Sequence, residues 1–184
     1  DLLGKVTQSV YHIDGTDFIQ KFEYAVTGLP LGYTYPDDRK VIYGYNNAGQ
    51  LETVGAENLQ SVQENIVNNI DYSPTGAVSK IEMANGTVTE NIYDPQQLYR
   101  LTQKTTTDSN EKKLQDLSYT YDPVGNILQI VDASETNAAK TTDYAYDDLY
   151  RLTKATVTAT PNEQNYERTY TYDILGNILH KSDV

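Results

Sequence analysis

The chain has 184 residues, of which 26 are acidic and 14 are basic, and its net charge is −12. This excess of negative charge argues against nucleic acid and anionic membrane surfaces as partners, because both are bound by clustered Lys and Arg. The chain has no cysteine, which excludes disulfides and thiolate metal sites, and no stretch approaches the roughly 18 apolar residues of a membrane span.

The first part of the chain alternates predicted strands with turns. Alternating apolar and polar residues predict strands, which we place over 6–11, 18–26, 33–35 and 41–45. Turns are expected where Asp, Asn, Gly and Pro gather, namely at Asp14-Gly15, at residues 36–39 and at residues 46–49. This order of strands and turns predicts hairpins.

Residues 57–69 are ambiguous. Leu59, Val62, Ile66 and Val67 fall near helical spacing, whereas the spacing of the surrounding turns favours two strands, which is our prediction. Strands then follow over 70–72, 78–83 and 87–93. Between the last two, the dipeptide Asn85-Gly86 predicts a hairpin turn of type I′.

The second part of the chain is more regular. Strands are predicted over 101–107, 117–121, 127–131, 142–146, 152–158, 166–172 and 178–180, with loops at 108–111, 132–140 and 160–165. Asp122-Pro123-Val124-Gly125 fits a type I turn, in which Asp caps the first position and Pro presets the second. We therefore expect positive φ at the turn glycines Gly49, Gly76, Gly125 and Gly176.

The turns recur with a regular spacing. A tyrosine lies four residues before the turn glycine in five copies: Tyr24 and Gly28, Tyr45 and Gly49, Tyr72 and Gly76, Tyr121 and Gly125, and Tyr172 and Gly176. Two copies replace the glycine with a Tyr-Arg pair: Tyr93 before Tyr99-Arg100, and Tyr146 before Tyr150-Arg151. Bulky residues are outliers at positive φ, so Tyr99 and Tyr150 are expected to close their turns differently.

With Gly4 these copies give eight anchors spaced 21 to 27 residues apart, which indicates a repeat architecture. The predicted repeat-turn positions also include the aspartates that follow the tyrosines, Asp94, Asp122, Asp147 and Asp173. The expected fold is all-β: one domain over 1–184, an antiparallel meander of roughly sixteen strands. Its end strands, near Val6 and Ile178, would be open edges able to pair with other chains.

The Tyr-Asp core with Gly-Asn or Tyr-Arg endings resembles the Rhs or YD repeat of bacterial Rhs proteins, teneurins and the B and C subunits of insecticidal Tc toxins. The carrying stretches are IDYSPTGAVSKIEMANGTVTENIYDP (70–95), LQDLSYTYDPVGNILQIVD (114–132) and YAYDDLYRLTKAT (144–156). The resemblance implies a curved β-strip that spirals into a hollow shell around a toxic polypeptide. No segment before Val184 resembles the family's self-cleaving core, so no residue receives a protease role.

Catalytic signals are weak. His12 and His180 are far apart in sequence, and no nucleophile elbow, phosphate loop or zinc-protease motif occurs. Asp37-Asp38 and Asp147-Asp148 fall in predicted turns, where Asp caps backbone amides. Residues 14–17 resemble a calcium loop but lack its later ligands. We therefore expect no enzyme activity, no cofactor and no metal.

Two functions remain open. The resemblance implies a shell segment of a secreted or cell-surface bacterial toxin, extended by further Rhs repeats or a second shell subunit. The alternative is an extracellular carbohydrate-binding adhesion module, because tyrosine rings and carboxylates suit sugars and the tyrosines could stack as a ladder across hairpins. A toxic domain encoded downstream would favour the first, and a surface anchor without an effector the second.

Overall fold

The computed structural model describes residues 4–60, 62–134, 139–159 and 165–182. The chain divides into two compact units, Asp1–Thr87 and Val88–Val184, and each is described by itself. The one helix among the described residues is η1 (Pro95–Gln97), a single 3₁₀ turn of three residues. No helix in this part of the chain is long and apolar enough to cross a membrane.

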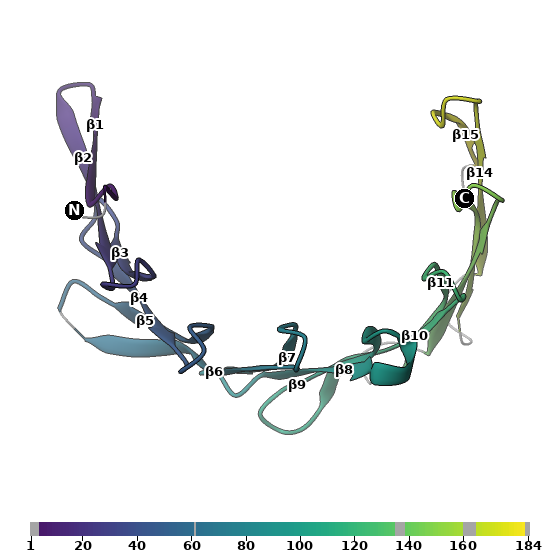
Figure 1. Ribbon diagram of the computed structural model, residues 1–184, viewed down its shortest axis with the longest axis horizontal. Coiled ribbons are helices and arrows are strands. Elements are labelled where there is room, and N and C mark those ends of the chain that lie inside the picture. The colour runs from purple at the N-terminus through teal and green to yellow at the C-terminus, as the bar shows by residue number, and fades with distance from the viewer. Residues whose placement is uncertain (1–3, 61, 135–138, 160–164, 183–184) are drawn as a thin grey trace. The chain divides into compact units, whose positions relative to one another are not determined.

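The first unit is a meander of seven antiparallel strands, each paired with its neighbours in chain order (Figure 1). The strands are β1 (Gln8–Ile13), β2 (Thr16–Tyr24), β3 (Pro30–Thr34), β4 (Lys40–Tyr45), β5 (Leu51–Glu57), β6 (Gln63–Tyr72) and β7 (Val78–Met83).

The second unit repeats this arrangement with eight antiparallel strands in chain order. They are β8 (Val88–Asp94), β9 (Arg100–Thr107), β10 (Lys113–Tyr121), β11 (Ile127–Asp132), β12 (Lys140–Tyr146), β13 (Leu152–Ala159), β14 (Tyr166–Tyr172) and β15 (Ile178–Lys181).

The all-β, antiparallel expectation is therefore confirmed. The described residues hold fifteen strands rather than the expected sixteen, because the repeat around Gly4 contributes only the strand after its turn. Within their units, β1 and β15 are paired on one side only, as expected for the end strands.

The ambiguous stretch forms strands, as predicted from the turn spacing. β5 ends at Glu57 and β6 begins at Gln63. Between them, the Asn58 side-chain oxygen accepts the N–H of Gln60 at 2.9 Å and of Val62 at 3.1 Å, which closes a tight turn. The apolar residues at helical spacing do not pack against a second layer of structure, as the exposure of Leu59 (64%) and Val62 (50%) shows.

The turn at Asn85-Gly86 differs from the prediction. Gly86 has φ +84°, but Asn85 is not among the residues with positive φ, which a type I′ turn requires at both central positions. The Gly86 N–H donates to the Met83 carbonyl at 3.0 Å, and Asn85 Oδ1 accepts the Thr87 N–H at 2.9 Å. The asparagine side chain thus supports an ordinary turn that ends in a left-handed glycine.

Each unit is a sheet without a dry core. Among the described residues, the buried apolar side chains are Ile70, at 9% exposure, and Val157, at 3%. Asp116 is also buried, and hydrogen bonds from Lys113 Nζ at 2.6 Å and Gln103 Nε2 at 3.0 Å hold its pKa below the usual value despite the opposing effect of burial. Hydrogen bonds and lateral contacts between neighbouring strands therefore carry most of the cohesion.

Val157 is flanked by Thr142 of β12 and Tyr166 of β14. We expect Val157→Ala to lower the free energy of unfolding by about 1–2 kcal/mol, because it removes buried apolar surface and leaves a small cavity. The matched control is Val124→Ala at a turn that is 60% exposed, which should change stability by less than about 0.5 kcal/mol. Urea unfolding of both variants measures the difference, and equal losses would contradict the assignment of Val157 to the core.

Candidate functional site in the repeat turns

Five of the repeat turns are built around an aspartate or asparagine that follows the tyrosine, whereas Ala25 and Ser73 follow Tyr24 and Tyr72. Asp122 Oδ1 accepts the N–H groups of Gly125 at 2.7 Å and Asn126 at 2.8 Å, while the Asp122 carbonyl accepts the Gly125 N–H at 3.1 Å. Asp147 and Asp173 also cap two N–H groups each, those of the second and fourth residues after the aspartate. These contacts fix the turn locally, so the short sequence after each tyrosine is sufficient to specify it.

Asn46 has the same role with an amide oxygen, which accepts the N–H groups of Ala48 and Gln50 at 3.0 Å. Asp94 instead begins a longer connection that contains η1, and its side chain accepts from Gln96 N–H at 2.8 Å and from Gln97 Nε2 at 2.9 Å.

The turn glycines adopt left-handed backbone conformations, as predicted. Their φ angles are positive at all five tyrosine-linked glycines: Gly28 (+85°), Gly49 (+76°), Gly76 (+84°), Gly125 (+109°) and Gly176 (+92°).

The expectation that the two tyrosine turns close differently was wrong for Tyr150 but holds for Tyr99, whose longer connection contains η1 and ends with the Tyr99 N–H donating to the Asp94 carbonyl at 2.8 Å. Both tyrosines nevertheless occupy the left-handed region, with φ +56° at Tyr99 and φ +59° at Tyr150. The Tyr150 N–H donates to the Asp147 carbonyl at 2.9 Å, which is the bond that glycine makes in the other turns. The aspartate cap therefore imposes the same turn on a bulky residue, at the cost of some backbone strain.

The capping carboxylates have lowered pKa values. The Asn177 side chain, followed by backbone N–H groups, lowers the pKa of Asp173, and the backbone N–H of Arg151 has the largest effect on Asp147. At Asp122, desolvation is the largest single effect and raises the pKa, but the hydrogen bonds from Asn126 and neighbouring N–H groups together outweigh it. Each turn therefore favours the ionised carboxylate.

In five repeats, the tyrosine before the turn reaches back to the preceding repeat through its hydroxyl group. Tyr146 donates to the Ile127 carbonyl at 2.8 Å, and Tyr172 donates to the Leu152 carbonyl at 2.7 Å. Three other pairs follow the same rule: Tyr45 to Pro30 (2.7 Å), Tyr72 to Leu51 (2.6 Å) and Tyr121 to Leu101 (2.7 Å). We call these five bonds the hydroxyl ladder.

In every rung, the accepting carbonyl belongs to a residue of the preceding repeat. Across the turn of that repeat, this residue pairs with the repeat's own tyrosine. Ile127 pairs with Tyr121, and Leu152 pairs with Tyr146. The register shifts by one residue at the tyrosine in each of these hairpins, as expected for a β-bulge. The bulge thus fixes the carbonyl that the next tyrosine meets, so each turn sets the position of the following repeat.

Three basic residues make the reciprocal contact, from one repeat to the turn of the next. Arg100 donates to the carbonyls of Asp122 at 2.9 Å and Pro123 at 3.0 Å, and its guanidinium lies 5.6 Å from the centroid of the Tyr121 ring. Lys5 is placed in the same way: it donates to the Gly28 carbonyl and lies 4.7 Å from the Tyr24 ring centroid. Cations at such distances are attracted by the ring face.

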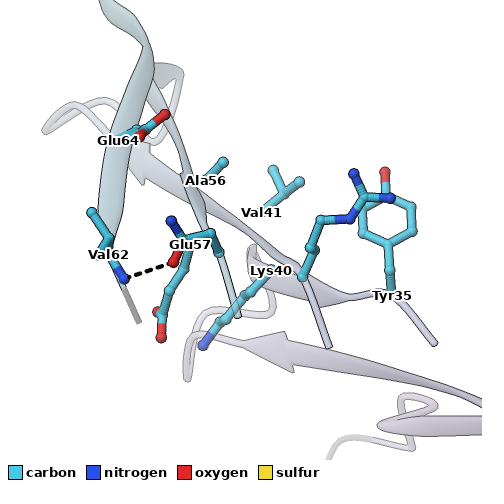
Figure 2. A pocket seen from close by; sticks show the side chains of 9 residues that line it. Tyr35, Lys40, Val41, Ala56, Glu57, Val62 and Glu64 are labelled. Carbon is cyan, nitrogen blue, oxygen red and sulfur yellow. Dashed lines mark hydrogen bonds between the residues drawn. The ribbon is translucent and has the colours of Figure 1, made fainter. Parts of the chain in front are cut away.

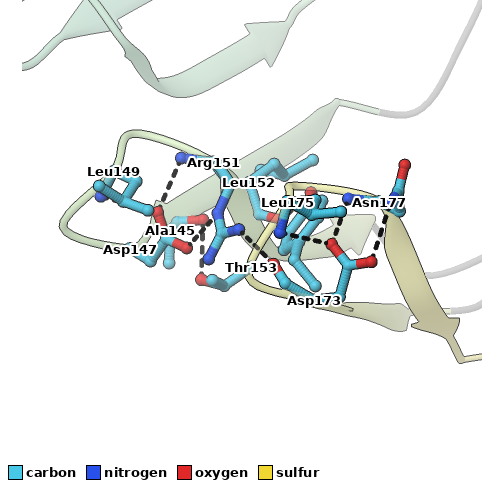
Figure 3. A network of polar contacts seen from close by, with 10 residues as sticks. Ala145, Asp147, Leu149, Arg151, Leu152, Thr153, Asp173, Leu175 and Asn177 are labelled. Carbon is cyan, nitrogen blue, oxygen red and sulfur yellow. Dashed lines mark hydrogen bonds and ion pairs between the residues drawn. The ribbon is translucent and has the colours of Figure 1, made fainter.

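Arg151 combines both kinds of contact (Figure 3). Its Nε donates to Asp147 Oδ2 at 2.7 Å within its own turn, and its Nη1 donates to the Asp173 carbonyl of the next turn at 3.1 Å. The guanidinium lies 4.6 Å from the Tyr172 ring centroid. The Arg151 side chain therefore links two consecutive turns. In the opposite direction, the Tyr172 hydroxyl donates to the carbonyl of Leu152, the residue directly after the first of these turns.

All of the repeat-turn positions expected from the sequence lie at or beside these turns. The sequence reasoning missed the hydroxyl ladder and the basic residues that oppose it, Lys5, Arg100 and Arg151, although a Lys or Arg directly after three of the eight anchors was a visible signal. The ring pairs Phe22–Tyr33 and Tyr33–Tyr35 lie on β2, on β3 and at the residue directly after β3, and neither contains a turn tyrosine.

The remaining polar candidates take part in local contacts. Asp37 accepts from the Arg39 side chain at 2.6 Å, and Asp17 lies 2.5 Å from His12 Nδ1 across the β1–β2 hairpin. His180 lies on β15 in the other unit. Within the described ranges, no three His, Asp or Glu side chains come together as they would around a metal ion.

A surface concavity of about 370 Å³ lies in the first unit, between the ends of β3–β4 and β5–β6 (Figure 2). Tyr35, Val41, Ala56 and Glu64 face it from the same side of the sheet, whereas the side chains of Lys40 and Glu57 extend toward the opposite side. Its lining thus combines an apolar floor with an aromatic ring and a carboxylate.

The left-handed glycines provide a matched pair of variants. A Cβ at Gly125 would lie 3.0 Å from Arg100 Nη2, whereas a Cβ at Gly176 would meet nothing within 4 Å. Gly176→Ala should therefore cost about 1 kcal/mol of unfolding free energy from backbone strain alone. Gly125→Ala should cost roughly 1 kcal/mol more, because Arg100 must also leave its carbonyls. Equal losses in denaturant unfolding would contradict this placement of Arg100.

The hydroxyl ladder predicts the effect of removing one oxygen atom. Tyr146→Phe should reduce the free energy of unfolding by about 1 kcal/mol, because the hydrogen bond to Ile127 is lost while the ring remains. Tyr150→Phe is the control, since this tyrosine is 59% exposed and makes no ladder bond, and it should be close to neutral. Chemical denaturation of the two variants checks the prediction, which fails if Tyr150→Phe is the more damaging.

The capping carboxylates predict acid sensitivity. A lowered pKa in the folded state means that the stabilisation is complete above the ordinary Asp pKa of about 3.9 and is lost as the pH falls through the lowered value. Asp173→Asn should flatten this dependence below about pH 4, because an amide can cap the turn without titrating, as Asn46 does. Thermal unfolding between pH 2 and pH 7 tests this, and an unchanged acid slope would refute it.

Comparison with known proteins gives a consistent set of relatives. No family model matches the chain. Toxin subunit YenC2 of Yersinia entomophaga is 31% identical over 167 residues, and toxin subunit YenC1 of the same organism is 29% identical over 164 residues. Each alignment covers 73% of this chain and 17% of the relative, so the chain spans about a sixth of the length of these proteins.

Solved structures with the same fold come from Tc toxin assemblies. A Photorhabdus luminescens Tc holotoxin pore with a mutated TccC3 matches 95% of this chain and 10% of that chain, with a TM-score of 0.81 and 26% identity. A TcdB2–TccC3–Cdc42 structure matches 93% of this chain and 10% of that chain, with a TM-score of 0.79 and 27% identity. Together with the repeat turns, these likenesses show that the chain is related to the Tc toxin subunits, in agreement with its resemblance to the Rhs or YD repeat.

Proposed function

We propose that this chain is a segment of the wall of a toxin-complex shell that encloses a toxic polypeptide. The observation that carries the proposal is the single-layer sheet of each unit, in which rungs of the same hydroxyl ladder bind a repeat to the one before it. A sheet of this kind can be lengthened indefinitely by adding repeats, because every repeat presents the acceptor that the next one needs.

A lengthened sheet provides the wall of a container. Strongly twisted sheets that become wide curl or close, and closure removes unpaired edges while creating an interior. An interior shielded from solvent can hold an unfolded chain that would otherwise expose its apolar residues. The chain spans 17% of its curated relatives, so we propose that it needs further repeats or a second shell subunit to complete such a wall.

The relatives support this role. They are toxin subunits, and the similar solved structures are assemblies of Tc components. We therefore propose that the partners are other components of a toxin complex, and that the protein acts outside the bacterial cell that makes it. In this role the chain would be a passive wall without turnover or cofactor.

The direct test is protection of the enclosed segment. The full-length protein that carries this chain, assembled with its complementary shell subunit, is treated with protease, and the lifetime of its toxic segment is measured. We expect protection in the wild type and faster digestion in the double variant Arg100→Ala, Arg151→Ala, because both turn-to-turn links are lost. Val124→Ala is the exposed control and should retain protection. Rapid digestion of the toxic segment in the wild-type assembly would overturn the proposal.

The concavity between β3–β4 and β5–β6 favours a second candidate, a carbohydrate-binding adhesion module. Its volume of about 370 Å³ and its lining by Tyr35, Arg39 and Glu64 suit a sugar ring. A glycan array decides between the two functions: sub-millimolar binding to one defined sugar, lost in Tyr35→Ala and kept in Tyr150→Ala, would support adhesion. Without such binding the wall proposal stands alone.

A further inference from the structure

The two faces of the second unit's sheet differ in chemistry. Residues paired directly across neighbouring strands lie on the same face, as do residues two positions apart in one strand. The register therefore gives one face of β10–β14 two rows of side chains, namely Tyr119, Ile130, Thr142, Val157 and Tyr166 in the first and Tyr144, Ala155 and Arg168 in the second. Tyr170, two residues beyond Arg168 on β14, also lies on this face. We call it the tyrosine face.

On the opposite face, the carboxylates of β12 and β14 already have donors within the sheet. Lys154 Nζ lies 2.5 Å from Glu167 Oε2, and Gln129 Nε2 donates to Asp143 Oδ1 at 2.7 Å. The polar side chains of that face therefore bind one another.

The tyrosine face instead carries two cations beside one ring. Lys140 Nζ lies 6.0 Å from the centroid of the Tyr166 ring, and the Arg168 guanidinium lies 5.6 Å from the same centroid. β12 and β14 both run antiparallel to β13, and the register places Tyr166 level with Thr142. Lys140 precedes this level by two residues and Arg168 follows it by two, so the cations approach the ring from opposite ends.

Neither cation has a carboxylate within ion-pair distance in the described part of the chain. Asp132 is paired with Lys140 in the register, but its Oδ1 accepts the Ser134 N–H at 3.0 Å instead. The Arg168 Nε is a buried donor that has no hydrogen-bond partner among the described residues. Since a buried donor without an acceptor costs free energy, a ligand that brings an acceptor to this guanidinium is favoured.

Tyrosine hydroxyls gather around the same point. Burial raises the pKa of Tyr144, and the charges of Tyr166 and Tyr170 raise it further, although a hydrogen bond with Thr142 lowers it. The Tyr144 hydroxyl therefore stays protonated at neutral pH and is able to donate. An ammonium, a guanidinium and phenol groups thus supply donors at one place on the tyrosine face.

Donors of this kind select an anion rich in acceptors. Lys and Arg side chains have no acceptor atom, and the guanidinium fork matches the two oxygens of a carboxylate. A neutral sugar would need acceptors for its own hydroxyl protons, which Lys140 and Arg168 do not supply. The rings of Tyr144 and Tyr170 add apolar surface for the groups on either side of the anion.

We infer that Arg168 and Lys140, beside the Tyr166 ring, form a binding site for a carboxylate side chain of a partner polypeptide. The occupant is an acidic segment in which Glu or Asp is flanked by apolar residues, because its charge complements the two unpaired cations and its apolar neighbours complement the rings. This site goes beyond the proposed wall function and does not depend on it, since its side chains all belong to one unit.

The test uses the 184-residue chain and the capped peptide acetyl-Gly-Leu-Glu-Leu-Gly-amide, with the Gln peptide of the same length as its neutral match. The Glu peptide should shift the NMR signal of the Arg168 Nε–H. The Gln peptide should bind about ten-fold more weakly, because it lacks the charge-assisted hydrogen bonds. Added salt should weaken only the binding of the Glu peptide. Equal affinity of the two peptides would overturn the inference.

Variants of the chain locate the binding. Arg168→Gln should reduce the affinity for the Glu peptide about ten-fold or more, and Lys140→Gln about three-fold. Lys154→Gln is the matched control, since it removes a cation from the opposite face, and it should keep the affinity. Amide exchange in β13 checks that each variant is folded. If Arg168→Gln does not fold, the comparison of Lys140→Gln with Lys154→Gln decides, and equal losses in these two would refute the site.

Inorganic sulfate and a sulfated disaccharide are titrated in the same way to distinguish the source of the anion. Tighter binding of either than of the Glu peptide would overturn the assignment to a polypeptide. An Arg168 signal that does not move with the Glu peptide would refute the site itself. The wall proposal is judged separately, by protection of the toxic segment.

Discussion

The hydrogen bond from a tyrosine hydroxyl to a carbonyl of the preceding repeat is the contact on which this structure most depends. In a domain with two packed layers, a buried core positions one element against the next. Here the buried apolar side chains among the described residues are Ile70 and Val157, so a core cannot have that role. The ladder replaces it with directional bonds of 2.6 to 2.8 Å that recur in five of the repeats.

Tyrosine suits this position for a physical reason. Its ring covers the apolar surface of the neighbouring strand, and its hydroxyl meets a carbonyl that would otherwise need water. Phenylalanine would leave that carbonyl unsatisfied, and a shorter polar residue would not reach it. The basic residues Lys5, Arg100 and Arg151 complement it from the other side, because they satisfy turn carbonyls and lie against the ring of the same tyrosine.

A sheet held together in this way has properties that a globular domain lacks. Its cohesion is local to each pair of repeats, so stability grows with length and no repeat depends on a distant one. The acidic composition, with a net charge of −12, discourages unspecific pairing between such sheets.

The sequence alone determined the repeat, the strand order and most of the turn chemistry. Asp122, Gly125 and their equivalents form turns through contacts that span at most four residues, so local sequence is sufficient to predict them. The same locality explains why residues 57–69 were correctly assigned to strands despite the helical spacing of their apolar residues.

Only the tertiary structure decided how the repeats recognise one another. Tyr146 and Ile127 are 19 residues apart and Arg151 and Asp173 are 22 apart, and a bulge at each tyrosine sets their register. The backbone of Tyr150 was mispredicted for a related reason: residue preference disfavours positive φ for tyrosine, but the aspartate cap imposes it. Contacts across repeats depend on geometry that the turns create, and this geometry is not visible in the spacing of residues along the chain.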